Sequence, residues 1–150
     1  MKLEYPNDGV ALEHGGGCHR IHMMVKPGRQ FDLEERTASF GETVIRFAQT
    51  IRETAVTRPL VSQMVRAATS VGANYCEAND AESKADFRHK IGICRKESRE
   101  TGHWLRMLTA ALPDSAPETR KLWQEAKELN LIFGAVMRTL SSRKAPSDDT

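Results

Sequence analysis

Five basic residues recur along one edge of a predicted helix, where side chains of this type bind phosphate groups. We call these residues the basic edge: Lys84, Arg88, Arg95, Arg99 and Arg106. At about 100° per residue they fall within an arc of about 60°, and they extend over about 33 Å of helix axis. The acids Asp86, Glu97 and Glu100 fall outside this arc. Such an edge attracts polyanions, although a charged helix face often does no more than keep a bundle soluble.

The positive charge of the chain is concentrated around this edge. The whole sequence has 22 Lys and Arg against 20 Asp and Glu, a formal net charge of only +2. Residues 84–112 contain seven Lys and Arg against three acids, whereas residues 33–54 contain three basic residues against four acids. The overall charge therefore says little about partners, and the local excess indicates an anionic partner for this helix.

Two groups of residues have side chains that bind metals. Glu100 and His103 form an E-x-x-H pair, the spacing that di-iron bundles use. Those sites need a second such pair on another helix, and the sequence has none. The second group matches no zinc motif in its spacing. It consists of His14, Cys18, His19 and His22. We therefore expect no metal site and no cofactor.

No set of residues indicates a catalytic centre. The sequence has no Gly-rich phosphate loop, and no Ser, His and acid residues at spacings that suggest a triad. Cys94 occupies a core position, where a neutral thiol packs as a small hydrophobic group. We expect a protein that is not an enzyme and has no catalytic residues.

Asn74, Lys90 and Glu97 are predicted to have structural roles. Asn74 lies on the core stripe of its helix, where an amide must find hydrogen-bond partners. It either belongs to a polar site inside the bundle or bonds to a neighbouring helix and sets the register, and we favour the second. Lys90, Glu97 and Trp104 follow one another at intervals of seven. They form either an interface with another subunit or, as we favour, a half-buried ion pair beside a packed indole within one bundle.

Four amphipathic segments must position these residues. In each one, apolar residues recur at steps of four and three, which predicts a helix with one buried face. The predicted helices cover about residues 32–54, 59–79, 83–111 and 115–142. Because short connections favour antiparallel neighbours, the fold class is predicted to be all-α, an antiparallel up-down-up-down four-helix bundle.

Side chains near the predicted helix ends support these boundaries. Asp32 can cap the first helix, since its carboxylate accepts hydrogen bonds from exposed amides. Ser83 with Asp86, and Ser115 with Glu118, have the spacing of a capping box. The fourth helix is also apolar over a wide angle, which indicates deep burial or self-association.

The remaining sequence is predicted to form tails around one domain. Residues 31–142 form the bundle, residues 1–30 a flexible, Gly-rich N-terminal tail, and residues 143–150 a disordered C-terminal tail. Three cysteines without regular spacing indicate a reducing compartment. No apolar run approaches the ~20 residues that cross a bilayer. We expect a cytoplasmic protein without a membrane partner.

One long ordered series of residues resembles a known bacterial family of four-helix bundles. The series consists of Ser70 to Tyr75, Glu77-Ala78, Ala81 to Lys84, Asp86-Phe87, His89-Lys90, Lys96-Glu97, Glu100-Thr101 and Trp104-Leu105. The family is named after proteins encoded in intervening sequences of 23S ribosomal RNA genes. A weaker resemblance extends from about Phe31 to Leu140. The chain departs from the family pattern at Gly102-His103, where an aromatic residue often precedes the Trp.

The resemblance implies partners as well as a fold. Members of the family assemble into homo-oligomeric rings, often pentamers. Related accessory proteins of diversity-generating retroelements use a positive surface to engage nucleic acid and a reverse transcriptase. We therefore expect a non-catalytic, homo-oligomeric scaffold that binds structured RNA or a ribonucleoprotein through the basic edge. The alternative is a protein–protein assembly module whose basic edge contacts an acidic protein.

Overall fold

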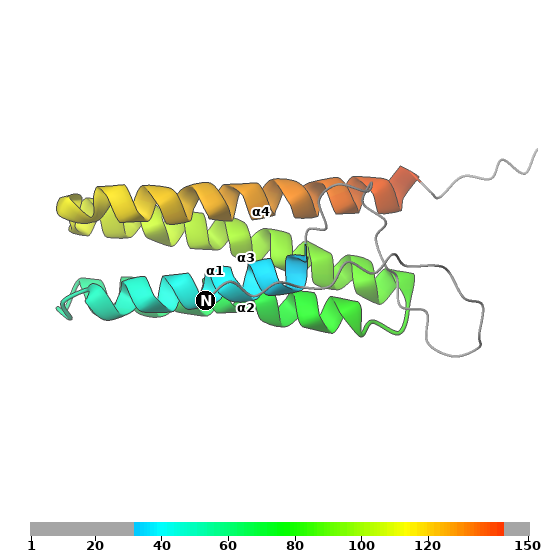
Figure 1. Ribbon diagram of the computed structural model, residues 1–150, viewed down its shortest axis with the longest axis horizontal. Helices are drawn as coiled ribbons and strands as arrows, with labels where there is room; N and C mark the ends of the chain where they lie inside the picture. Colours follow the sequence, from blue (N-terminus) through cyan, green and yellow to red (C-terminus); the bar gives the residue numbers. More distant parts are fainter. Residues whose placement is uncertain (1–31, 143–150) are drawn as a thin grey trace, which may run out of the picture.

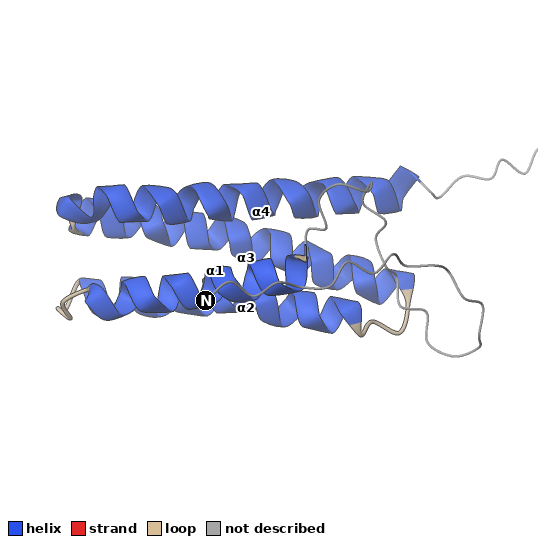
Figure 2. Ribbon diagram, viewed as in Figure 1, coloured by secondary structure: helices blue, strands red, loops and turns tan. Residues whose placement is uncertain are grey.

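The structure, a computed structural model, describes residues 32–142 as four antiparallel α-helices (Figure 1). They are α1 (Leu33–Thr50), α2 (Thr57–Asn79), α3 (Lys84–Ala111) and α4 (Ala116–Ser142), with a short 3-10 turn, η1 (Pro113–Ser115). The described residues contain no strand (Figure 2). Consecutive helices are joined at alternating ends of the bundle. The predicted all-α four-helix bundle is confirmed, and both predicted tails lie outside the described residues.

Two of the predicted helix caps are present. The Asp32 carboxylate accepts hydrogen bonds from the amides of Glu34 and Glu35, each at 3.1 Å. The Ser83 hydroxyl accepts one from the amide of Asp86 at 3.1 Å. These bonds satisfy amides that the first turn of a helix cannot pair internally.

The predicted cap of the fourth helix is wrong. Ser115 lies inside η1, and its hydroxyl donates to the carbonyl of Leu112 at 2.7 Å instead of accepting from the first turn of α4. Pro113 begins this turn, and α4 starts one residue later than Ser115, at Ala116. The hydroxyl therefore closes the turn between α3 and α4.

Threonines shape the turn between α1 and α2, and they shift both helix ends from the prediction. Thr57 is buried; its hydroxyl donates to the carbonyl of Arg52 at 2.8 Å and accepts from the amide of Thr54 at 2.9 Å. The Thr54 hydroxyl accepts from the amides of Val56 and Thr57. As a result α1 ends at Thr50, earlier than predicted, and α2 begins at Thr57, before Pro59.

The apolar stripes of the four helices meet in one core. Its largest fully buried hydrophobic side chains are Phe133, Met64, Ile91, Leu105, Leu108, Leu129, Val44 and Val71. Ser98 and Thr101 lie among them and are fully buried, but their hydroxyls donate to carbonyls of their own helix, each at 2.8 Å. The polar groups on the α3 stripe are therefore satisfied locally.

The helices do not share their surfaces equally. α3 packs extensively against both α2 and α4, whereas α1 packs mainly against α2 and touches α4 little. A cavity of about 490 Å³ lies between α1 and α4, lined by Phe40 and Leu122 among charged residues. Arg36 and Glu125 join α1 to α4 through two hydrogen bonds of 2.7 and 3.0 Å. α3 is therefore the central helix of the bundle.

The threonine turn gives the first testable prediction. Thr57→Ala removes a buried hydroxyl that bonds to a carbonyl and an amide of the turn, and we expect the free energy of unfolding to fall by about 1–3 kcal/mol. Urea denaturation measures this change. Thr57→Ser keeps the hydroxyl and should retain most of the stability. Equal losses for the two variants would show that the methyl group, and not the hydrogen bonds, stabilises this turn.

Candidate nucleic-acid interface

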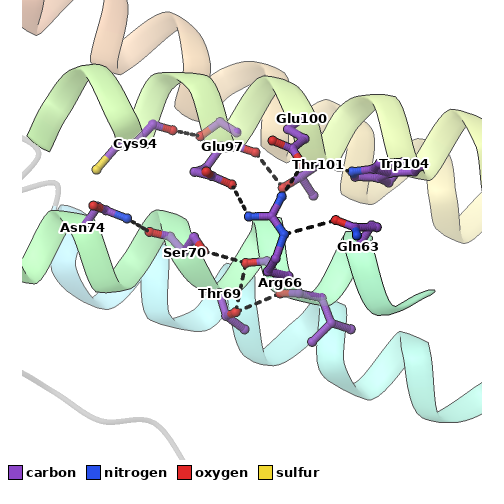
Figure 3. Close-up of polar contacts among 12 residues, drawn as sticks. Gln63, Arg66, Thr69, Ser70, Asn74, Cys94, Glu97, Glu100, Thr101 and Trp104 are labelled. Atoms are coloured by element: carbon purple, nitrogen blue, oxygen red, sulfur yellow. Dashed lines mark hydrogen bonds and ion pairs between the residues drawn. The ribbon is translucent and has the colours of Figure 1, made fainter. Parts of the chain in front are cut away.

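The two edges of α3 have different surroundings. The edge that carries Glu97 and Glu100 faces α2, where both carboxylates pair with Arg66 (Figure 3). The opposite edge carries the basic residues and borders α4, because Gly102 lies against Trp123 and Arg95 lies over Gly134. Packing in the bundle therefore separates Glu97 and Glu100 from the arginines of α3.

Arg66 is the centre of the polar network between α2 and α3. Its Nη1 lies 3.5 Å from Glu97 Oε2, another of its nitrogens pairs with Glu100, and its Nε donates to Gln63 Oε1 at 3.1 Å. Trp104 Nε1 donates to Glu100 Oε1 at 3.2 Å (Figure 3). The relative solvent exposure of Glu97 is only 9%, so its carboxylate is largely shielded from solvent.

The predicted structural ion pair forms with different partners. Lys90 pairs with Glu77 of α2, and Glu97 pairs with Arg66, so the two residues do not pair with each other. Both contacts lie within one chain. Trp104 is half-buried and packs against the core. The intervals of seven correctly indicated that Lys90, Glu97 and Trp104 share one edge of α3. This edge faces α2, and charged side chains of α2 lie closer to Lys90 and Glu97 than these two lie to each other, two turns apart along α3.

The predicted role of Asn74 as a link between helices is not what the structure shows. Asn74 is half-buried, and its Nδ2 donates to the carbonyl of Ser70 at 2.8 Å, within α2 itself (Figure 3). An amide at a helix surface reaches the carbonyl one turn earlier without help from a neighbour. Asn74 therefore does not set the register between helices through this bond.

Two side chains of α3 have shifted pKa values that bear on chemistry. Burial raises the pKa of the Cys94 thiol to about 12, and its Sγ lies 3.5 Å from the carbonyl oxygen of Val71. This thiol stays protonated at neutral pH, and only the thiolate is an effective nucleophile. Partial burial raises the pKa of Glu100, but the Trp104 hydrogen bond and the Arg66 charge outweigh it and hold that pKa below the usual 4.5.

All five residues of the basic edge are exposed. Within residues 32–142 none of these side chains makes an ion pair, whereas six ion pairs form elsewhere. Unpaired cations on one edge, with Glu97 and Glu100 occupied on the other, produce a positive surface field. The helix spacing predicted from sequence thus places the five residues on one exposed edge.

α4 adds residues to this surface that the sequence analysis did not assign to it. Trp123 packs over Gly102, with its Cδ1 3.4 Å from the position a side chain there would take. Lys127 Nζ lies 5.3 Å from the centre of the Trp123 ring. Arg138 lies beside Arg95 over Gly134. Residues 123, 127, 134 and 138 are spaced by four, seven and four, so helical periodicity was the signal that would have grouped them.

The described residues do not assemble a metal site. Across residues 32–142 no three His, Cys, Asp or Glu side chains gather closely enough to hold an ion. Glu100 pairs with Arg66, while the His103 ring meets Trp104 edge-on at 5.0 Å. The N-terminal group of His14, Cys18, His19 and His22 lies outside the described residues. No helix of the described part has the length and apolar content needed to span a bilayer.

Fold and surface together define a class of protein: an antiparallel four-helix bundle with a cationic face on α3 and α4. Residues 29–135 match the family model described as 23S rRNA-intervening sequence protein, and the chain belongs to this family. A solved structure from Bacteroides thetaiotaomicron, of a protein with unknown function from the S23 ribosomal protein family, is similar at 25% identity and a TM-score of 0.63. The similarity covers 70% of this chain and 97% of that one. No curated protein matches.

The lowered pKa of Glu100 gives a testable pH dependence. A carboxylate whose pKa falls on folding stabilises the folded state above its unfolded pKa, and this contribution disappears as the pH falls through the folded pKa. Glu100→Gln should therefore lower the free energy of unfolding at pH 7 by up to about 1 kcal/mol.

Chemical denaturation across a pH series measures this difference, which should shrink steadily below pH 4.5, the usual pKa. Glu82→Gln is the matched control, because Glu82 is exposed and makes no ion pair within residues 32–142. A Glu100→Gln deficit that stays constant to strongly acidic pH would contradict the assigned pairing with Arg66.

Proposed function

We propose that this protein is a non-catalytic, homo-oligomeric scaffold of the bacterial cytoplasm that binds structured RNA or a ribonucleoprotein through the basic edge. One observation carries the proposal: five exposed cations follow one side of α3 without an ion pair in the described residues, while Arg66 occupies Glu97 and Glu100 on the other side. The family name, which refers to 23S rRNA, supports an RNA-related role.

The energetics favour a polyanion as the partner. Like charges one turn apart on a helix repel by a few tenths of a kcal/mol per pair, and a polyanion relieves this repulsion. Each phosphate that a Lys or Arg neutralises releases counterions and contributes about −0.7 to −0.9 to the slope of log affinity against log salt. A row of cations on a rigid helix contacts backbone phosphates more readily than base edges, so the binding is expected to be only mildly sequence-selective.

A specific surface of α4 supports the homo-oligomer. Leu131 is 56% exposed on a helix whose inner face is already buried. Self-association that covers this side chain would remove apolar surface from water. A closed ring, such as a pentamer, would also repeat the basic edge around the assembly. A reverse transcriptase is a candidate protein component of the ribonucleoprotein.

The second candidate function is a protein–protein assembly module whose basic edge contacts an acidic protein. The same unpaired arginines favour it, because an acidic surface also relieves their repulsion. The two functions differ in one measurement. RNA binding with a steep dependence on salt supports the first. Absence of RNA binding, together with salt-sensitive binding of an acidic protein, supports the second.

The RNA proposal predicts the behaviour of a charge-reversal variant. Arg88→Glu with Arg95→Glu places two carboxylates on the basic edge, and we expect at least a hundredfold loss of RNA affinity at low salt. Both side chains are exposed, so the bundle should fold and assemble normally. Fluorescence anisotropy with a labelled RNA hairpin, repeated across a series of KCl concentrations, measures affinity and salt slope.

The matched control reverses two charges on the far side of the bundle. Arg46→Glu with Arg52→Glu makes the same change in net charge at exposed positions on and just after α1, which packs mainly against α2. This control should keep most of the affinity and the parental salt slope. If Arg88→Glu with Arg95→Glu folds, assembles and binds RNA like the parent, the basic edge is not the RNA-binding surface.

The oligomer proposal is tested on α4. Light scattering at micromolar concentration should give a mass several times that of one chain, and Leu131→Asp should reduce it by placing a charge in the apolar contact. Val56→Asp, at an apolar residue that is 61% exposed in the turn before α2, should leave the mass unchanged. A parent protein that scatters as a monomer would contradict the ring.

A further inference from the structure

An open hollow between α3 and α4 brings two arginines from different helices together. It has a volume of about 430 Å³, and Arg95, Gly134, Met137, Arg138, Ser141 and Ser142 line it. Gly134 is buried and forms part of its wall. A side chain at Gly134 would begin 3.5 Å from Arg138 Nη1 and 3.5 Å from Arg95 Nε. Both guanidinium groups therefore approach the same point.

No carboxylate compensates these two charges in the described part of the chain. Neither Arg95 nor Arg138 makes an ion pair there. On α4, the Glu125 carboxylate pairs with Arg36 of α1, and the Glu128 carboxylate accepts a hydrogen bond from Gln124. Two like charges at close range raise the electrostatic energy of the free protein, and a bound anion lowers it.

Contacts between α3 and α4 keep Arg95 and Arg138 close to each other. Asn130 Nδ2 donates to the carbonyl of Arg95 at 2.8 Å, which ties α4 to the backbone of Arg95 one turn before Gly134. Gly92 of α3 lies close to Met137 of α4, with 3.8 Å between the Met137 methyl and the position of a side chain at Gly92. The helices are therefore fixed against each other around this point before any ligand arrives.

Helix capping does not explain the position of Arg138. Cations stabilise a helix at its C-terminus only within the last turn, and α4 has no basic residue there. The hydroxyls of Ser141 and Ser142 donate to carbonyls of their own helix, at 2.9 and 3.1 Å. The two arginines are therefore the free hydrogen-bond donors that this hollow offers to an anion.

We propose that Arg95 and Arg138 form one shared seat for a phosphodiester group of the bound RNA. A guanidinium group offers a planar fork of N–H donors that matches two phosphate oxygens, so two forks can hold one phosphate from two sides. The inference rests on the proposed RNA-binding function and deepens it. It makes α4 part of the RNA-binding surface and fixes one phosphate at a defined place between two helices.

A double-mutant cycle tests the shared seat. Arg95→Gln and Arg138→Gln each remove one fork, and each should weaken binding of a labelled RNA hairpin about tenfold. Because both arginines serve the same phosphate, the double variant should bind only slightly more weakly than either single variant, instead of about a hundredfold more weakly than the parent. The salt slope should fall by about 0.7–0.9 in either single variant and no further in the double variant.

Arg120→Gln is the matched control. It makes the same change in charge on the same helix, at an exposed residue about 27 Å along the axis from Arg138. It should change the affinity less than twofold, and its effect should multiply with that of Arg95→Gln. All these substitutions lie at exposed positions, and circular dichroism and light scattering confirm the fold and assembly.

The possible results separate the seat from the wider function. If the parent binds RNA with a steep salt slope but the effects of Arg95→Gln and Arg138→Gln multiply, the shared seat is overturned and the RNA-binding function stands. If the parent does not bind RNA, both are overturned. Calorimetry with inorganic phosphate provides the last comparison: micromolar binding that Arg138→Gln abolishes, with RNA affinity unchanged, would assign the hollow to a free anion and overturn the proposal.

Discussion

The pairing of Arg66 with Glu97 and Glu100 is the interaction on which the surface chemistry of this bundle depends. One guanidinium on α2 engages two carboxylates that lie one turn apart on α3. The contact holds these two carboxylates toward α2, whereas the arginines of α3 lie on the side of α4. It also opposes sliding of α2 along α3, because a shift of one turn would leave a nearly buried carboxylate without its partner.

The side of α3 that faces α4 follows a different rule. Small residues replace ion pairs there: Gly102 accommodates Trp123, and Gly134 makes room for two arginine side chains. No ion pair joins α3 to α4 at these contacts in the described residues, so the arginines beside them remain available to a ligand. In contrast, α1 and α4 meet through an Arg36–Glu125 pair in which both charges are already compensated.

Much of the fold followed from periodicity. Steps of four and three located four helices and most of their buried residues, because a helix in a bundle must bury one continuous stripe. Local hydrogen-bond chemistry at the helix ends was less predictable. Ser115 has the spacing of a cap, yet its hydroxyl closes a 3-10 turn. Thr57 begins α2, and its hydroxyl donates to the carbonyl of Arg52 in the turn before that helix.

The candidate site was only half predictable for a physical reason. The basic edge lies on one helix, so the sequence spacing of its residues fixes their positions relative to one another. The meeting of Arg95 with Arg138 depends on how far α4 is shifted along α3, and no local spacing encodes this shift. The same limit explains Asn74: its position on a core stripe was predicted correctly, but only the packed structure shows that its amide bonds within α2.

The uneven packing of the four helices also determines how the bundle moves. α1 is the shortest of them, with 18 residues, and an open hollow of about 490 Å³ lies between it and α4. Because α1 packs mainly against α2, we expect the free energy of its opening to be the lowest of the four. Amide hydrogens of α1 should then exchange with solvent through this partial opening, whereas those in the middle of α3 should exchange only when the whole bundle unfolds. On this account the face that carries the cations belongs to the slowest-exchanging part of the bundle.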